Sequence, residues 1–372
     1  MAFAGLVAAL VFGFVAVSAL GQTIWRVTIT GPNDGQVTVW DVSADSQTQA
    51  EDLAWDQLRA ASTTSAVGSG RCTKVASTTG SDSASGTEAA PFRTAQKLVS
   101  SLSSGQTGCL RAGTYSADNE VKVSNAGITL TSYPGERARL TTRLWIAADG
   151  VTVHDLVLDG VNAGDLPSPT VSANDAVFRN NVVTNEHTAI CFDLGSRSYG
   201  RAARTLIAAN RIHDCGRLPA TNHDHGIYVA RADDTVIRDN LIYRNADRGI
   251  QLYPDAQRSK ITGNVIDGNG EGIIFGGDSE VASSNNLIEN NLITNAQIRY
   301  NVESYYSSGD PIGTGNIVRN NCIWGGEQGN TQGPGFSATD NLIANPLYVD
   351  RASGNFALLG GSPCAGIRNG SA

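Results

Sequence analysis

Asparagines flanked by pairs of apolar residues recur at nearly constant spacing through the second half of the chain. The segment Val236-Ile-Arg-Asp-Asn-Leu-Ile242 shows the pattern. Successive copies lie 24 to 30 residues apart, and the repeated residues are Asn181, Asn210, Asn240, Asn264, Asn291 and Asn321. A period in this range predicts a stack of short units, each of which buries its apolar face against its neighbours.

A second short strand is predicted inside most of these intervals. Three copies begin with Gly-Ile, at Gly226, Gly249 and Gly272, and a fourth candidate is Ala189-Ile-Cys-Phe192. We expect each coil to hold two or three strands separated by bends, with the repeated asparagines stacked at a tight bend. Asparagine tolerates left-handed backbone geometry there, and its amide can bond along the stack. The composition agrees, since 22 of the 28 asparagines lie between residues 174 and 345.

These repeats, with residues 80–92 and 113–115, resemble the right-handed parallel β-helix of the pectate lyase-like superfamily. The resemblance covers roughly residues 72–372 and implies an all-β solenoid, with 345–350 and 361–363 resembling its closing coil. A helix over 91–102 is expected to cover the open end, because one face would carry Phe92, Ala95, Leu98, Val99 and Leu102. The superfamily includes lyases, epimerases, hydrolases and non-catalytic adhesins, so the resemblance specifies fold more than reaction.

The first 71 residues predict three further segments. Residues 1–21 are apolar and read as a signal peptide, with an uncleaved anchor or a mis-assigned start as alternatives because no cation precedes the apolar run. Residues 22–60 predict a small ββα module: strands over 23–30 and 36–40, then a helix starting near Ser46. Residues 61–71 read as a linker. We therefore expect a secreted, monomeric protein whose mature form does not enter a membrane.

Six cysteines form an even set in a chain expected to be exported, which predicts disulfides. Fifteen pairings are possible for six cysteines. Order along the chain favours joining neighbours: Cys72 with Cys109, Cys191 with Cys215, and Cys322 with Cys364.

The charge distribution limits the possible partners. A formal net charge of −8 argues against nucleic acid, whose binding depends on clustered Lys and Arg. Residues 174–260 nevertheless carry 12 cations and 10 anions, together with four of the five histidines. An acidic substrate therefore remains compatible with the sequence in this part of the chain.

The candidate catalytic residues precede the Gly-Ile strands at equal spacing. His225, Arg248 and Glu271 lie 23 residues apart, which predicts one column in successive coils. Lysis or C5 epimerisation of a uronic acid polymer needs a base, a cation for the carboxylate and an acid. We expect His225 to be the base, Arg248 the cation and Tyr228 or Tyr253 the acid. The alternative is an ion-pair ladder that closes the turns. Surface ion pairs of this kind contribute little to stability.

Neighbouring residues are expected to bind substrate. By strand alternation, Cys191, Tyr228, Gln251 and Ile274 should point outward, on the face where the superfamily commonly binds glycans. The candidate binding residues are His223, Gln251, Tyr253 and Glu271. The turn over 215–225 is unusually long, and a disulfide from Cys191 to Cys215 would fix it beside this face.

Two further groups of carboxylates have specific alternative roles. Asp255 and Asp278 each lie six residues after a repeat glycine, which permits a Ca²⁺ site. Asp233 and Asp234 would suit inverting glycoside hydrolysis, although the Arg-Ile-Lys signature of β-helix hydrolases is absent. Lys260 begins a second strand away from the expected site and is not expected to act as a base.

The function predicted from the sequence is that of a polysaccharide lyase or C5-epimerase acting on an acidic glycan. The alternatives are a non-catalytic carbohydrate-binding β-helix and, third, a glycoside hydrolase.

Overall fold

A computed structural model describes residues 16–19, 22–30, 37–43, 72–117 and 119–367. The chain divides into two compact units, residues 1–70 and 71–372. The predicted linker, the helix of the ββα module and most of the predicted signal peptide lie outside the described residues.

The N-terminal unit contains a three-stranded antiparallel sheet. Strand β2 (Gln22–Thr30) pairs with β3 (Val37–Ser43), as the alternation of the sequence predicts. A further strand, β1 (Ala16–Ala19), pairs with the start of β2 and was not expected. It falls inside the predicted signal peptide, whose cleavage stays a prediction.

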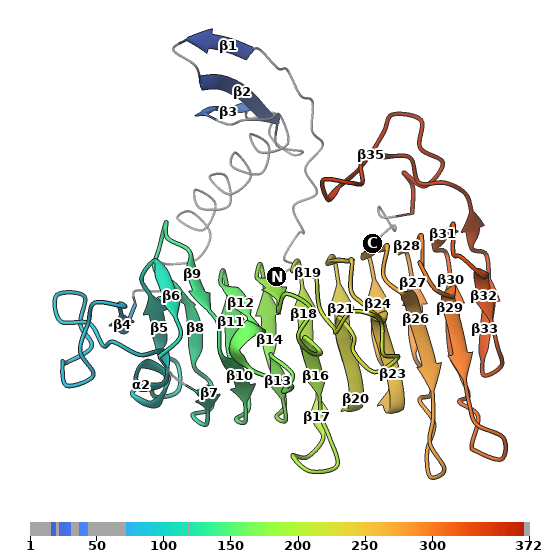
Figure 1. Cartoon of the computed structure of the whole chain (residues 1–372), viewed down its shortest axis with the longest axis horizontal. Helices are drawn as coiled ribbons and strands as arrows, with labels where there is room; N and C mark the ends of the chain where they lie inside the picture. Colours follow the sequence, from blue (N-terminus) through green and yellow to red (C-terminus); the bar gives the residue numbers. More distant parts are fainter. Residues whose placement is uncertain (1–15, 20–21, 31–36, 44–71, 118, 368–372) are drawn as a thin grey trace, which may run out of the picture. The chain divides into compact units, whose positions relative to one another are not determined.

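The second unit is the predicted parallel β-helix (Figure 1). Successive coils contribute strands to three parallel sheets, here called sheets I, II and III. Sheet I contains β7 (Glu120–Val123), β10 (Arg143–Ile146), β13 (Thr170–Val171), β16 (Phe192–Leu194), β17 (Ala202–Ala203), β20 (Ile227–Asp233), β23 (Arg248–Gln257), β26 (Glu271–Gly276), β29 (Tyr300–Tyr305) and β32 (Gly329–Gln332).

Sheets II and III complete each coil in chain order. Sheet II contains β4 (Lys74–Ala76), β5 (Thr107–Leu110), β8 (Thr129–Ser132), β11 (Thr152–His154), β14 (Val177–Arg179), β18 (Leu206–Ala208), β21 (Val236–Arg238), β24 (Lys260–Thr262), β27 (Leu287–Glu289), β30 (Asn316–Arg319) and β33 (Phe336–Thr339). Sheet III contains β6 (Gly113–Tyr115), β9 (Ala138–Leu140), β12 (Val157–Asp159), β15 (Val182–Thr184), β19 (Arg211–His213), β22 (Leu241–Tyr243), β25 (Val265–Asp267), β28 (Leu292–Thr294), β31 (Cys322–Trp324) and β34 (Leu342–Ile343).

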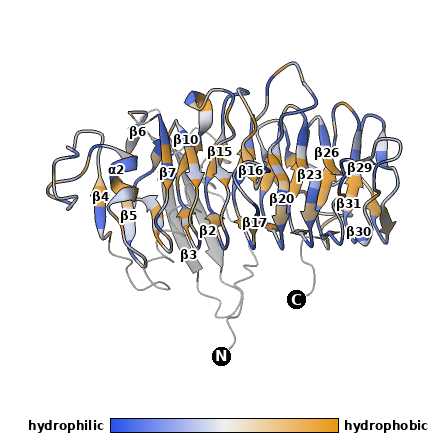
Figure 2. Cartoon of the chain, turned by 90° about the horizontal axis from the view of Figure 1, so that it is seen from below, coloured by the Kyte–Doolittle hydropathy of each residue, from blue (hydrophilic) through white to orange (hydrophobic). Residues whose placement is uncertain are grey.

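Strand alternation builds the core. Ile227, Ile250 and Ile273 are stacked partners in sheet I and are fully buried, as predicted. Hydrophobic and polar residues alternate along many of the strands (Figure 2). The interior is thus filled by columns of aliphatic side chains, which explains how a chain with 6% aromatic residues builds a large core.

The repeated asparagines form a buried ladder between sheets II and III. The Nδ2 of Asn240 donates to Asn264 Oδ1 at 2.9 Å, and Asn264 donates to Asn291 Oδ1 at the same distance. The expected left-handed geometry belongs to the preceding residue instead, as at Asp239 (φ 58°) and Asn290 (φ 59°). The ladder asparagine itself continues into the next strand, and its amide satisfies the carbonyls that the bend leaves unpaired.

The predicted helix over 91–102 is shorter than expected. Helix α2 spans Ala95–Ser100 and begins at the N-cap Thr94, whose side chain accepts a bond from the Lys97 backbone NH. The expected apolar face is nevertheless buried in the core, including Phe92 and Leu102 outside the helix. A 3₁₀ turn covers Gly160–Asn162.

The C-terminal segment folds back onto sheet III. Strands β35 (Tyr348–Asp350) and β36 (Asn355–Leu358) pair with each other, and Phe356 packs 5.2 Å from Tyr243 between ring centroids. All three predicted disulfides form, and Cys322–Cys364 ties this segment to β31. Within the described parts of the chain, no helix has the length and apolarity that crossing a bilayer requires.

Candidate functional site

The outward side of sheet I carries a column of four polar or aromatic residues and one isoleucine. Strand register places Asp193, Tyr228, Gln251, Ile274 and Glu303 at equivalent positions in five successive coils. Neighbours in such a column are about 4.8 Å apart. We call this set the site column.

The sequence prediction for the first of these coils was wrong by two residues. Phe192, not Ile190, is the partner of Ile227, so Asp193 occupies the position expected for Cys191. Cys191 does not point outward: it is fully buried and bonded to Cys215. Cys191 forms a disulfide with Cys215, and the strand begins at Phe192, a departure that the Gly-Ile pattern does not encode.

Buried polar atoms without a hydrogen-bond partner concentrate on sheet I. Four of the ten such side-chain atoms among the described residues lie on its strands: Asp193 Oδ1, Arg231 Nε, Gln251 Oε1 and Glu303 Oε1. A fifth, His225 Nδ1, lies just before β20. Leaving a buried polar atom unpaired costs free energy, so unpaired atoms gathered on one face indicate groups that a ligand would satisfy.

Asp193 and Tyr228 have perturbed acidities. Burial raises the pKa of Asp193 to about 7, and Arg143 only partly opposes this. Burial, and then the charge of Asp193, raises the pKa of Tyr228 well above its usual value. Asp193 is half-buried as a residue, with Oδ1 shielded from solvent. Near neutral pH this pair therefore combines a carboxyl that can gain or lose a proton with a phenol that keeps its own.

His225 lies behind Tyr228 and not over the face of the sheet. It is 2% exposed, and its ring stands edge-on to Tyr228 with centroids 5.4 Å apart. Burial and the positive charge of Arg248 lower the pKa of His225 well below its usual value. The imidazole is therefore neutral at pH 7 and packs edge-on against the Tyr228 ring.

Arg248 and Glu271 form the predicted column, and both are buried. They are register partners of β23 and β26, and Arg248 Nε donates to Glu271 Oε2 at 3.2 Å. Arg248 also donates to the backbone oxygen of Asn222 at 2.7 Å, which closes the long loop over the guanidinium. Burial, aided by the neighbouring carboxylate of Glu303, raises the pKa of Glu271 to about 7. The arrangement of Arg248 and Glu271 thus agrees better with the alternative of an ion-pair ladder than with a set of catalytic residues open to substrate.

The loop over 216–224 is fixed at several points. The backbone NH groups of His223 and Asp224 both donate to Asp247 Oδ2 at 2.8 Å, and Arg217 Nε donates to Asp224 at 2.6 Å. The Cys191–Cys215 disulfide closes its base. His223 itself is exposed on this loop.

The other predicted binding residues lie on or beside the site column. Gln251 is half-buried and its Oε1 has no partner. Tyr253 lies two positions further along β23 and packs on Gly276, where a Cβ would approach the tyrosine ring to 2.9 Å. The absence of a side chain at residue 276 thus makes room for Tyr253.

Arg231 is a site residue that the sequence analysis missed. It follows Tyr228 on β20, after an irregularity in the pairing with β23. It has no hydrogen bond or ion pair to the side chains described by the structure, and its Nε is buried without a partner. Alternation from the inward Ile227 would place Arg231 inward, and the irregularity after Val229 instead puts it in register with Asp255. The sequence carries no signal for this shift.

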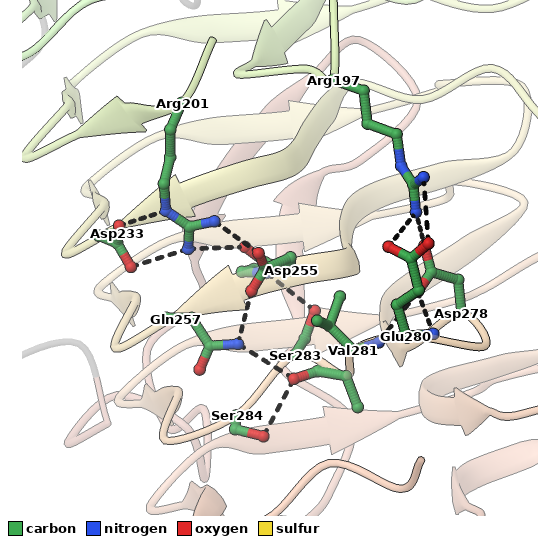
Figure 3. A network of polar contacts seen from close by, with 12 residues as sticks. Arg197, Arg201, Asp233, Asp255, Gln257, Asp278, Glu280, Val281, Ser283 and Ser284 are labelled. Atoms are coloured by element: carbon green, nitrogen blue, oxygen red, sulfur yellow. Dashed lines mark hydrogen bonds and ion pairs between the residues drawn. The ribbon is translucent and has the colours of Figure 1, made fainter. Parts of the chain in front are cut away.

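The carboxylates proposed for calcium and for hydrolysis are held by arginines (Figure 3). Arg201 bonds to Asp233 and also to Asp255 at 2.5 Å, while Arg197 bonds to Asp278 at 3.1 Å. Across the described ranges, no group of three or more His, Cys, Asp or Glu could hold a metal ion. The residues present do not fit a calcium site, because their negative charge is already compensated.

Asp234 is likewise paired, with Arg258 at 2.8 Å, and Lys260 pairs with Glu289 at 3.1 Å on sheet II. The remaining histidines lie in or beside sheet III and sheet II turns. His154 bonds to Asp155 and His213 to Asp214, which indicates a structural role.

Comparison with known proteins agrees with this architecture. Residues 145–343 match the family described as the right handed beta helix region, and the chain belongs to that family. It is similar to the crystal structure of pectate lyase Pel9A (TM-score 0.55, 12% identity, covering 78% of this chain and 90% of that one).

A second similar structure is the complex of XylC with xylose (TM-score 0.54, 13% identity, covering 73% of this chain and 69% of that one). No curated protein matches the chain. At these identities the similarities establish the fold alone.

Proposed function

We propose that this protein is a polysaccharide lyase or C5-epimerase that acts on a uronic-acid-containing glycan lying along the site column. The observation that carries the proposal is the pair formed by Asp193, whose pKa burial raises to about 7, and Tyr228, whose phenol stays protonated. The fold, shared with a structure titled as a pectate lyase, supports the choice of substrate class.

The roles differ from those predicted by sequence because His225 is buried. In the proposed reaction, the Asp193 carboxylate removes the C5 proton, and Arg231 neutralises the uronate carboxylate on which charge develops. Tyr228 donates its proton to O4 as the C4–O4 bond breaks and the C4–C5 double bond forms. In an epimerase, the same phenol would return a proton to C5 from the opposite side.

Hydrolysis is less well supported by the geometry. Glycosidases use two carboxyl groups about 5 to 10 Å apart. The other carboxylate of the site column is Glu303, four coils from Asp193, or about 19 Å at 4.8 Å per coil. Asp233, Asp234 and Asp255 are bound to arginines.

We also propose that the protein acts outside the cell, because three disulfides persist best in an oxidising compartment. The test is incubation with pectate, alginate and glycosaminoglycans, with and without Ca²⁺, while following the ultraviolet absorbance of unsaturated uronate. C5 inversion is followed by NMR in the same samples. If no polymer yields unsaturated uronate or inverted C5 centres, the proposal is rejected. New reducing ends without unsaturation would indicate a hydrolase. Binding without any product would indicate a non-catalytic glycan-binding protein.

A further inference from the structure

An exposed aromatic side chain on the loop after β16 packs against Trp145, which lies two coils before Asp193. Tyr199 is 47% exposed, and its ring stands edge-on to Trp145 with centroids 4.9 Å apart. Trp145 is aligned through Thr170 with Asp193 in the register of the sheet. Tyr199 therefore extends the outward surface that begins at the site column.

The loop that carries Tyr199 is rigidly closed. Ser196 and Gly200 exchange two backbone hydrogen bonds, of 2.8 and 3.2 Å, and the Tyr199 NH donates to Ser196 Oγ at 2.9 Å. Gly200 has φ 100°, which favours glycine at this position of the turn. The tyrosine is thus presented at the tip of a tight hairpin-like turn.

Two arginines flanking this turn anchor it to later coils (Figure 3). Arg197 bonds to Asp278 and Glu280 beyond β26, and Arg201 bonds to Asp233 and Asp255 on β20 and β23. Both anchors lie within two residues of Tyr199. An exposed aromatic ring held by so many contacts is preorganised, so binding to it costs little conformational entropy.

A cation without a carboxylate partner lies beside these rings. Lys122 is the register partner of Trp145, and its ammonium group lies 3.8 Å from the centroid of the indole. No ion pair of Lys122 occurs among the described residues. Arg143, by contrast, is buried and already paired with Glu120 at 2.8 Å. Lys122 is therefore the group that can meet an incoming carboxylate.

We propose that Tyr199, supported by Trp145, is a stacking subsite for a uronate ring, and that Lys122 binds the carboxylate of that or the adjacent sugar. The inference rests on the proposed function, since it assumes that the glycan that reacts at Asp193 continues along sheet I to Trp145. A sugar presents a C–H face that stacks on an aromatic ring, and the two coils between Trp145 and Asp193 correspond to about 10 Å. The subsite thus sets how many sugars separate the bound ring from the reacting bond.

The test measures binding separately from catalysis, with the full chain and hexasaccharides of galacturonate, mannuronate and chondroitin as probes. Titration calorimetry is performed on the wild type, Tyr199→Ala, Tyr199→Phe and Lys122→Ala, with Trp324→Ala as an exposed aromatic control on sheet III. We expect Tyr199→Ala to lower the affinity for the probe that the wild type binds by about tenfold. Tyr199→Phe and the control should bind as the wild type does, and Lys122→Ala should lose affinity only at low salt.

The outcomes separate the subsite from the reaction. If no probe yields product but Tyr199→Ala weakens binding, the subsite stands and the lyase proposal fails. If the wild type forms product and Tyr199→Ala leaves both affinity and KM unchanged, the subsite is rejected. Failure of all three probes to bind the wild type would also reject it, and melting curves would identify any variant that is unfolded.

Discussion

Asp193 and Tyr228 are direct register partners on neighbouring coils, and both side chains leave sheet I on its outward face. The negative charge of Asp193 helps to raise the pKa of Tyr228, after the larger effect of burial. Asp193 is proposed as the base and Tyr228 as the acid. Ionisation of the Asp193 carboxyl favours both roles, because its negative charge helps the phenol to stay protonated. The pH dependence of activity should follow the carboxyl.

Activity is expected to rise with pH through about 7, where Asp193 ionises. Its neighbour Tyr228 should keep its proton throughout this range, so the profile reports the carboxyl. Asp193→Asn should reduce kcat about 100- to 10,000-fold, the usual contribution of a general base. The measurement is kcat/KM against pH, with Asp340→Asn on the exposed bend after β33 as the control. A flat profile in the wild type would contradict the assignment.

The same substitution should make the fold more stable at alkaline pH. The pKa of Asp193 is raised in the folded state, so its contribution to stability declines between about pH 4, where the unfolded chain ionises, and about pH 7. An asparagine amide at this position carries no charge, so Asp193→Asn should be more stable than the wild type at pH 8 by about 1–3 kcal/mol. Urea denaturation at pH 4 and pH 8 measures this difference, which should shrink at pH 4. A less stable variant at pH 8 would mean that Asp193 has a favourable partner as an anion.

The solenoid was predictable because its signal is repeated many times. Each coil repeats the same apolar pairs and the same asparagine, and Asn210, Asn240 and Asn264 indeed bond to one another. Strand alternation then correctly placed Tyr228 and Gln251 outward. An error in one copy of the pattern does not affect the others.

The site was harder to predict because it depends on departures from the repeat. Cys191 is taken up by the disulfide with Cys215, and the register of the strand places Asp193, not Cys191, in the site column. The sequence did carry a signal for this position, because apolar Phe192 and Leu194 on either side of Asp193 indicate that Asp193 points outward. Burial of His225 arises from contacts of the loop with Asp247 and Arg248, which no local pattern encodes.

Arg231 and Arg248 should respond differently to conservative substitution. Arg231 has no partner in the described structure, so Arg231→Lys should raise KM about tenfold without lowering the melting temperature, because lysine cannot hold a carboxylate through two parallel bonds. Arg248 bonds to Glu271 and Asn222, so Arg248→Lys should destabilise the protein. Kinetics and thermal melts of both variants, with exposed Arg179→Lys on sheet II as a control, give the comparison. An unchanged KM in Arg231→Lys would remove Arg231 from the substrate site.

The asparagine ladder should be a major source of stability. Asn264 is fully buried; it donates to Ile237 O and Asn291 Oδ1, each at 2.9 Å, and accepts from both the backbone NH and the side chain of Asn240. Asn264→Ala leaves these groups unpaired and should cost about 2–4 kcal/mol of unfolding free energy.

Asn264→Asp tests whether hydrogen bonding, and not shape, is responsible for this cost. An aspartate at this position is nearly isosteric, but as a carboxylate it cannot donate to Ile237 O or Asn291 Oδ1, so it should destabilise at least as much as alanine at pH 7. Asn119 is exposed, and Asn119→Ala should change stability by less than about 0.5 kcal/mol. Equilibrium denaturation of the three variants measures these differences. If Asn264→Asp were as stable as the wild type, packing at the bend and not the ladder of amide bonds would hold the coils in register.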